Sequence, residues 1–349
     1  MPPSTSSAVE HLEALLQDVE AFRSLDGADT ARLIVERIVR DVPYVRDDED
    51  MRIIAEHVLD FAVFEDMSEA LAFLAQAAAD EDKPTLLVRM SLLLHFGLAT
   101  PNVFRRLAQD DWIPLLRDVV LRVDDDKVLH IAVILFEQLC QVYEMSLSEL
   151  DLIDSALIER LLDLVEASRD LDESYNYALL KLLICFNDQL LKKRGSLSMR
   201  NKLVQILAKR ANNCKTFSEN LIFIFNRADK PELQLSIVHL LTCIFQFPDT
   251  QYLFYTNDLT VIIDIAVRET QRVSDADEQL QHALLILMQL VVGAGASDRS
   301  AAQVKALLSW LSASPLSKGS TKRLAARILT EINSAGTPTS ATSVASAPL

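Results

Sequence analysis

Residues 219–268 contain three apolar runs that are separated by short joints of helix-breaking residues. The runs cover 221–225, 233–247 and 259–267, and the joints between them carry proline, asparagine and aspartate. Apolar runs of this length between such breakers are typical of consecutive buried helices. A chain built in this way has to pack helix against helix, and the pattern therefore predicts an all-α fold.

Comparable apolar runs recur along the chain, which indicates a repeating architecture. The runs begin at Leu86, Val128, Leu179, Leu233 and Leu284, and the successive spacings are 42, 51, 54 and 51 residues. Armadillo and HEAT units are somewhat shorter, at ~40–47 residues. We therefore expect an irregular armadillo/HEAT-like helical solenoid, in which each buried helix lies between neighbouring repeats. A compact, non-repetitive helical bundle is the alternative.

Composition agrees with a helical fold. Half of the 349 residues are apolar and only 7 are glycine, whereas leucine, alanine, isoleucine and acidic residues are abundant. We expect one helical-repeat domain over residues 8–333, a disordered lead at 1–7 and a disordered tail at 334–349, where small and polar residues mix with proline. Besides the three runs above, the expected helices cover 8–22, 30–40, 51–65, 68–79, 86–96, 127–145, 150–167, 174–194, 197–212, 277–292, 299–312 and 319–333.

Charge and hydropathy limit the partners of this chain. The formal net charge is −16, which argues against nucleic acid because binding to phosphates needs a basic surface. Charged or polar residues interrupt every apolar run, so we expect no membrane insertion. The first residues lack the basic and apolar regions of a signal peptide. Four isolated cysteines fit a reducing compartment. We expect a cytoplasmic protein.

The sequence contains no recognisable catalytic or metal-binding signature. Seven scattered glycines form no phosphate-binding loop, and the six histidines share no ligand spacing with one another or with cysteine. We therefore expect no catalytic residues, no metal and no cofactor, and a binding protein rather than an enzyme. An enzyme, as a third hypothesis, would require a pocket with clustered and perturbed titratable groups.

One basic stretch interrupts an otherwise acidic chain. Residues 181–230 hold eleven lysines and arginines against three acidic residues, a balance of +8. Eight of these cations form what we call the basic band: Lys192, Lys193, Arg194, Arg200, Lys202, Lys209, Arg210 and Lys215. Either the band is a solvated face with cations near two helix C-termini, or it binds an acidic partner and speeds its approach. The sequence leaves both interpretations open.

An aromatic pair followed by two capping residues, Phe254-Tyr255-Thr256-Asn257-Asp258, lies in the second joint. Asn257 or Asp258 can accept hydrogen bonds from the backbone N–H groups that open the next helix. We expect Phe254 and Tyr255 to hold the turn against the core. The alternative function for Tyr255 is to anchor a partner, as tyrosine often does at interfaces.

Several of these segments together resemble the leucine-rich domain of the WISH/DIP family. The matching residues are Glu219–Leu221, Phe225-Asn226-Arg227, Ile244-Phe245, the Phe254–Asp258 motif, Ile262–Ile265 and, upstream, Tyr177–Leu183 with Phe186-Asn187-Asp188-Gln189-Leu190. The resemblance is close over residues 175–270. Among the motif residues, Asn187, Asn226, Arg227, Phe254, Tyr255, Thr256, Asn257 and Asp258 are expected to be structural.

The resemblance implies a function in actin nucleation. WISH/DIP proteins activate the actin-related protein 2/3 complex, so the expected partner is that complex, contacted through a non-actin subunit, with actin itself as a further candidate. The expected product is an unbranched filament made without a mother filament. The chain resembles the short, fungal-type members, whose expected place is the cortical actin patch during endocytosis. The alternative is a passive armadillo-like scaffold that binds peptides or helices in cytoskeletal or endocytic assemblies.

Two short motifs resemble actin-regulating peptides only superficially. The Leu190–Lys193 sequence resembles a monomer-binding motif, and Asp110-Asp111-Trp112 resembles the acidic tails of other nucleation-promoting factors. Each lies within a helical segment rather than in a free tail. We therefore expect the leucines to belong to the core and Trp112 to be buried at the start of a helix.

Overall fold

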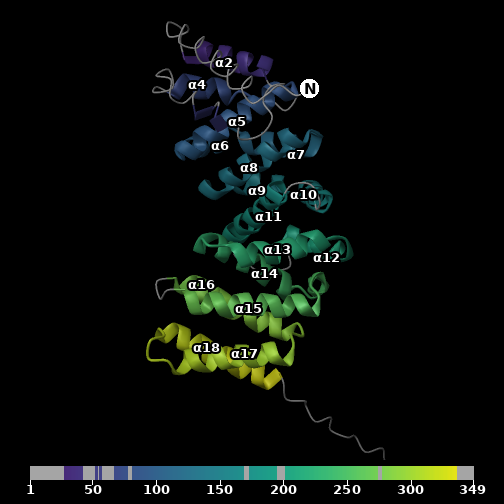
Figure 1. Ribbon diagram of the computed structural model, residues 1–349, viewed down its shortest axis with the longest axis vertical. Helices are drawn as coiled ribbons and strands as arrows, with labels where there is room; N and C mark the ends of the chain where they lie inside the picture. Colours follow the sequence, from purple (N-terminus) through teal and green to yellow (C-terminus); the bar gives the residue numbers. More distant parts are fainter. Residues whose placement is uncertain are drawn as a thin grey trace, which may run out of the picture. The chain divides into compact units, whose positions relative to one another are not determined.

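The computed structural model describes residues 27–41, 52–53, 55–56, 67–77, 81–168, 173–194, 201–273 and 277–335. The chain divides into two compact units, unit 1 over residues 1–193 and unit 2 over residues 194–349. Every regular element in the described residues is helical (Figure 1). Among these helices, none combines the length and apolarity that crossing a bilayer requires.

Unit 1 is built from helices that pack around α5 and α8. Its described elements are α2 Gly27–Asp41, α4 Met67–Leu74, α5 Lys83–Ala99, α6 Asn102–Gln109, α7 Trp112–Arg122, α8 Asp126–Val142, α9 Leu147–Leu152, α10 Ser155–Ala167 and α11 Glu173–Arg194. Helix α8 packs against α5, α6 and α7. The rings of Phe136 on α8 and Phe186 on α11 meet edge to face at 5.1 Å. Trp112 is 1% exposed and its indole N–H donates to the Ala75 carbonyl at 3.1 Å, as expected for this residue.

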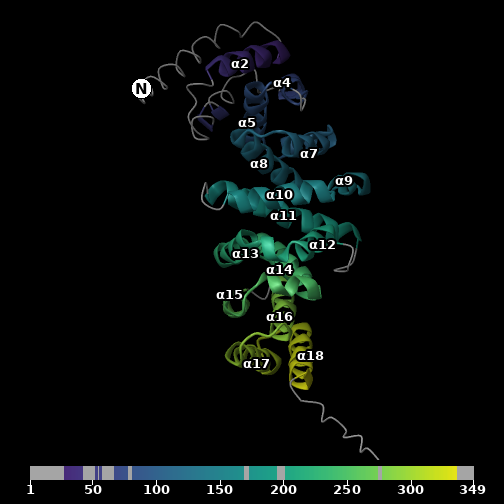
Figure 2. The ribbon, with the colours of Figure 1, turned by 90° about the vertical axis from the view of Figure 1, so that its right-hand side faces the viewer.

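Unit 2 is built around α16. Its elements are α12 Lys202–Lys209, the 3₁₀-helix η3 Ala211–Asn213, α13 Lys215–Arg227, α14 Pro231–Gln246, the 3₁₀-helix η4 Pro248–Leu253, α15 Thr256–Arg272, α16 Glu278–Gly293, α17 Asp298–Ala313 and α18 Gly319–Ala335. Helix α16 packs against α14, α15 and α18. Figure 2 shows α17 and α18 lying side by side at the end of this unit.

The five apolar runs found in the sequence all lie on helices with extensive burial. They fall on α5, α8, α11, α14 and α16, and the other helices α6, α7, α9, α10, α12, α13 and α15 lie between them along the chain. On α5, ten residues from Leu86 to Gly97 are buried. This alternation of buried and companion helices is the arrangement of a helical repeat. The predicted all-α, armadillo/HEAT-like class is thereby confirmed.

Polar side chains join the first turns of α16 and α18. The Glu278 carboxylate lies 3.2 Å from the Lys318 ammonium and accepts a hydrogen bond from the Ser320 hydroxyl. These hydrogen bonds, with the Lys318 charge, lower the pKa of Glu278. One turn further, His282 Nε2 lies 3.0 Å from Thr321 Oγ1. The last helix is therefore held to α16 by hydrogen bonds as well as by its buried apolar face.

Two predicted helices are shorter than the sequence pattern suggested. The segment 150–167 is divided between α9 and α10, because the Asp154 carboxylate accepts from the Leu157 N–H at 2.9 Å and starts a new helix there. In the described part of the segment 197–212, the α-helix covers Lys202–Lys209, after the Asn201 side chain caps it, and the 3₁₀-helix η3 follows. Capping side chains thus set boundaries that apolar periodicity alone does not reveal.

Several predicted segments lie outside the described residues. These are the lead at 1–7, the helix at 8–22, most of the helix at 51–65 and residues 336–349 of the tail. The last helix, α18, ends at Ala335, so residues 334 and 335, predicted as the start of the tail, are helical. The single domain over 8–333 stays a prediction.

Candidate interaction surface

The turn between α14 and α15 is fixed by buried side chains. Thr250 is buried in η4, and its hydroxyl hydrogen is shared between the carbonyls of Ile244 and Phe247, the latter at 2.7 Å. Phe254 is buried and stacks on Phe245 with ring centroids 5.3 Å apart. These contacts hold η4 and the two residues after it in one conformation.

Asp258 completes this turn at the start of α15. Its carboxylate accepts a hydrogen bond from the Tyr255 N–H at 2.8 Å, so one of the expected capping residues does cap the helix. The other, Asn257, is exposed, as is Thr256. The turn is therefore tied to the core on one side by Phe254 and to the next helix on the other by Asp258.

Tyr255 does not pack into the core as expected. Its side chain is 65% exposed, whereas that of the preceding Phe254 is buried. Both residues have extended backbone conformations, with φ −117° and ψ 138° at Phe254 and φ −80° and ψ 163° at Tyr255. Successive side chains of an extended segment point to opposite sides. Because Phe254 points inward, Tyr255 points to solvent.

Exposed tyrosines and cations gather around this turn. The Lys215 ammonium lies 5.9 Å from the centre of the Tyr255 ring, and Tyr252 in η4 is 83% exposed. Both α12 and η3 pack against η4, which brings Lys209 and Arg210 at the end of α12 to the same part of unit 2. We call Tyr252, Tyr255, Lys209, Arg210 and Lys215 the tyrosine–lysine patch.

The basic band is divided by the boundary between the units. Lys192 is exposed near the end of α11, where Lys193 and Arg194 are the last helical residues. Arg200 lies outside the described residues. From Arg194 onward the band belongs to unit 2, where Lys202 and Arg210 are partly exposed and Lys209 and Lys215 are exposed. Only this second part forms a described surface, and its role in binding stays a prediction.

The remaining motif residues lie on α11 and α13. Asn187 is fully buried on α11. The Asn226 side-chain oxygen accepts from Arg268 Nη1 at 2.9 Å, which links α13 to α15. The Arg227 guanidinium lies 3.9 Å from the centre of the Phe223 ring on the same helix. These positions are compatible with the structural role expected for them, which stays a prediction.

Gln189 is a buried polar residue to which the sequence interpretation gave no role. Its amide nitrogen donates to the carbonyls of Cys140 at 2.6 Å and Tyr143 at 2.8 Å, and its oxygen accepts from the Met145 N–H at 3.1 Å. One α11 side chain thus satisfies three backbone groups at the end of α8 and the loop that follows. The signal was present in the motif Asn187-Asp188-Gln189, because amide side chains that an apolar helix buries need hydrogen-bond partners.

A buried ion pair also joins α8 to α11. The Glu137 side chain is buried, and its carboxylate lies 3.1 Å from the Lys181 ammonium. The amides of Gln138, at 2.6 Å, and Gln141 donate to the same carboxylate. The Glu137 carboxylate is thus bound by side chains of α8 and α11 themselves. Its role is therefore to hold the two helices together rather than to bind or transform a ligand.

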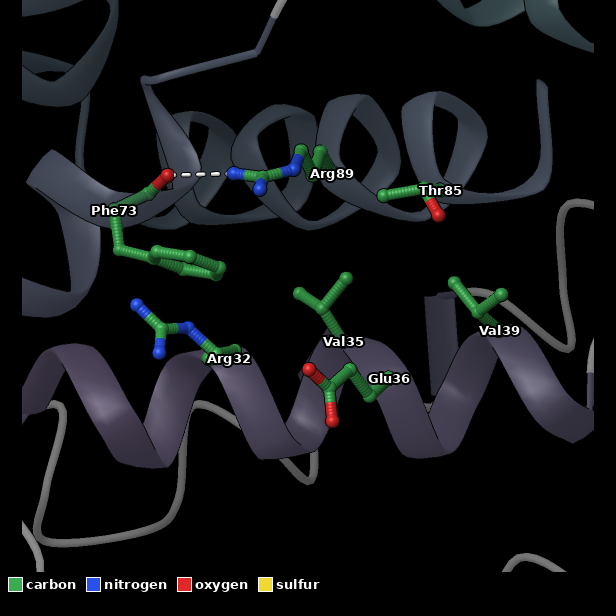
Figure 3. A pocket seen from close by; sticks show the side chains of 7 residues that line it. All are labelled: Arg32, Val35, Glu36, Val39, Phe73, Thr85 and Arg89. Carbon is green, nitrogen blue, oxygen red and sulfur yellow. Dashed lines mark hydrogen bonds between the residues drawn. The ribbon is translucent and has the colours of Figure 1, made fainter. Parts of the chain in front are cut away.

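Unit 1 has a cavity of about 380 Å³ between α2, α4 and α5 (Figure 3). Figure 3 shows the Phe73 ring between the guanidinium groups of Arg32 and Arg89. Arg89 lies 4.3 Å from the ring centre, donates to the Phe73 carbonyl at 2.6 Å and pairs with Glu81 at 3.0 Å. Its cation is thus already used within unit 1. Among the described residues, no group of three His, Cys, Asp or Glu side chains could hold a metal ion.

The α8–α11 contact also encloses the Cys140 thiol, which leads to a labelling prediction. Burial, reinforced by the neighbouring Cys185 and Glu137, raises the pKa of the Cys140 thiol well above its ordinary value, and burial raises that of Cys185 as well. A raised pKa leaves less thiolate, the reactive form, at neutral pH. We expect Cys140 in the native protein to react with iodoacetamide at least tenfold more slowly than in denaturant, measured by mass spectrometry of its tryptic peptide. Native labelling as fast as that of glutathione would contradict this packing.

The tyrosine–lysine patch lies within the part of the chain that matches known proteins. The family model described as the SPIN90/Ldb17 leucine-rich domain matches residues 172–303, from the start of α11 into α17. Protein dip1 of Schizosaccharomyces pombe is 28% identical over 192 residues, which cover 52% of this chain and 51% of the relative. Protein LDB17 of Saccharomyces cerevisiae is 29% identical over 177 residues, which cover 49% and 35%.

The match thus spans about a third to a half of the length of these curated relatives. Among solved structures, a designed armadillo repeat protein aligns with 75% of this chain and 98% of its own at a TM-score of 0.38 and 13% identity. An engineered protein aligns over 95% and 92% at a TM-score of 0.42 and 14% identity. The family model and the curated relatives agree with the resemblance seen in the sequence: residues 172–303 are similar to the leucine-rich domain of SPIN90/Ldb17 proteins.

Proposed function

We propose that this protein binds and activates the actin-related protein 2/3 complex. The observation that carries the proposal is the match of residues 172–303 to the SPIN90/Ldb17 leucine-rich domain, because the family resemblance implies this activity. In the same proposal, activation needs no preformed mother filament, and the products are linear filaments. The protein acts by binding rather than by catalysis, contacts a non-actin subunit and works in the cytoplasm, at cortical actin patches during endocytosis.

Activation by binding requires a preference between two states of the complex. The two actin-related subunits exist in an inactive arrangement and in a filament-like arrangement, and a ligand shifts this equilibrium only if it binds the second more tightly. A rigid ligand suits this task, because it does not have to be ordered when it binds. The turn between α14 and α15, held by Thr250, Phe254 and Asp258, has this rigidity.

The proposal is tested by actin assembly from purified components. The protein is mixed with the complex, ATP and actin monomers, without preformed filaments and without acidic-tail activators. We expect a shorter lag in assembly and unbranched filaments when single filaments are imaged by fluorescence microscopy. A reaction without the complex is the control, because acceleration there would mean that the protein nucleates actin alone.

Two results would contradict the proposal. Assembly at the rate of the complex alone would show that the protein does not activate it, and products that branch only from existing filaments would show a dependence on mother filaments. Binding to the complex without acceleration would instead favour the passive armadillo-like scaffold. The measurement therefore separates the two hypotheses that the sequence left open.

A further inference from the structure

The largest exposed aromatic side chains next to the basic band are Tyr252 and Tyr255. They lie three positions apart on the turn between α14 and α15, at 83% and 65% exposure. The apolar residues around them, Leu253 and Phe254, are buried. An exposed tyrosine ring leaves apolar area in water that a partner can cover, and tyrosine is enriched among the residues that dominate binding energy.

The backbone that carries these tyrosines is already ordered. The Thr250 hydroxyl donates to the Phe247 carbonyl, and Phe254 is stacked on Phe245. The Asp258 carboxylate accepts a hydrogen bond from the Tyr255 N–H. A partner that covers the rings therefore has to restrict only two side-chain torsions per tyrosine. Interfaces built on preorganised segments lose less conformational entropy on binding, so this turn is better suited to docking than a loose loop with the same residues.

The charges around the tyrosines define the chemistry of the partner. Lys215 lies 5.9 Å from the Tyr255 ring, and Lys209 and Arg210 lie at the end of α12, which packs on η4. Within the described residues, Lys215 pairs with the Glu219 carboxylate at 3.8 Å, and both side chains are about half exposed. A weak, solvated pair of this kind can exchange for a partner carboxylate at little cost.

We propose that the tyrosine–lysine patch docks an acidic protein surface, whose apolar centre covers Tyr252 and Tyr255 and whose carboxylates face Lys209, Arg210 and Lys215. This inference rests on the proposed function, in that the surface belongs to a subunit of the actin-related protein 2/3 complex. Aromatic residues and arginine are enriched in protein interfaces, whose rims are polar. Single-stranded nucleic acid also stacks on aromatic residues, but the net charge of −16 disfavours it.

The test is the affinity of the complex for variants of the patch in the full chain. Because both tyrosines are exposed, Tyr252→Ala and Tyr255→Ala should fold normally. We expect each to weaken binding about tenfold, measured by fluorescence anisotropy of the labelled complex. Lys215→Glu should mainly slow association, and its effect should shrink as salt rises. Trp310→Ala, which removes an aromatic side chain 56% exposed on α17, is the matched control and should change the affinity less than twofold.

Each outcome decides between this inference and the function on which it rests. If the unchanged protein binds the complex and the tyrosine variants bind equally well, the docking surface is overturned while the proposed function stands. If the unchanged protein does not bind the complex, both are overturned. Tighter binding of a single-stranded oligonucleotide that depends on the tyrosines would assign the patch to nucleic acid. Self-association that the tyrosine variants lose would assign it to a second copy of the chain, and either result would overturn the inference.

Discussion

Gly97→Ala is expected to destabilise unit 1 by about 3 kcal/mol, the upper end of the range of about 1–3 kcal/mol that is typical of overfilling a packed core. Gly97 is buried on α5, and a Cβ atom at this position would lie only 2.0 Å from a ring carbon of Phe104 on α6. Phe104 is itself buried, so its ring cannot swing into solvent. The two helices approach this closely only because residue 97 has no side chain.

The measurement can use the two tryptophans. Trp112 is buried in unit 1, whereas Trp310 in unit 2 is largely exposed, so the change in fluorescence on adding urea reports mainly on unit 1. Phe104→Leu should relieve the clash, so the double variant with Gly97→Ala should lose less stability than the sum of the single variants. Gly293→Ala, where a Cβ meets no atom within 4 Å, is the matched control and should leave the stability of unit 1 unchanged. An unchanged urea midpoint for Gly97→Ala would refute the close packing of α5 and α6.

Gln189→Leu is expected to lower the free energy of unfolding by about 3 kcal/mol or more. It leaves three backbone groups without their hydrogen-bond partners, and each such loss costs about 1–3 kcal/mol. The side chain has a similar volume, so the effect would come from the lost hydrogen bonds to Cys140, Tyr143 and Met145 and not from a cavity. The same urea titration of Trp112 fluorescence measures it. Gln109→Leu, on the exposed end of α6, is the control and should change stability by about 0.5 kcal/mol or less.

A loss as small as that of the control would show that Gln189 is not needed for the α8–α11 contact. If the loss is large, Gln189→Ala should be worse still, because it adds a cavity to the same missing hydrogen bonds. The comparison separates the hydrogen-bonding role of this residue from its packing role. It also tests whether the Asn187-Asp188-Gln189 motif is a structural part of the domain.

The helices were predictable because each buried helix requires a long run of apolar residues in the sequence. The runs that begin at Leu86, Val128 and Leu284 lie on α5, α8 and α16, whose buried faces are continuous enough to be recognised without a partner. The break at Asp154 was not predictable from apolar spacing, since Leu150 and Leu157 on its two sides are both buried. A single side chain that caps a helix decides such a boundary, and its hydrogen bond depends on local geometry.

The candidate surface was only partly predictable. The positive charge of the basic band is visible in the sequence, as is the capping role of Asp258. The exposure of Tyr255 is not, because an aromatic pair next to an apolar run looks the same whether one ring or both are buried. The extended backbone at Phe254 decides which ring points inward and which points to solvent. That backbone conformation depends in turn on the stacking of Phe254 on Phe245, nine positions earlier.

The hydrogen bonds between α16 and α18 have a consequence for where this chain can be shortened. The family match ends at residue 303, inside α17, and α18 lies wholly beyond it. A protein ended at that point would lose Lys318, Ser320 and the buried Ile328, and would uncover the side of α16 that α18 protects. Terminal elements of helical repeats shield the last buried helix from water. The smallest piece of unit 2 that keeps its own hydrophobic core therefore extends to Ala335, although the recognisable family sequence stops 32 residues earlier.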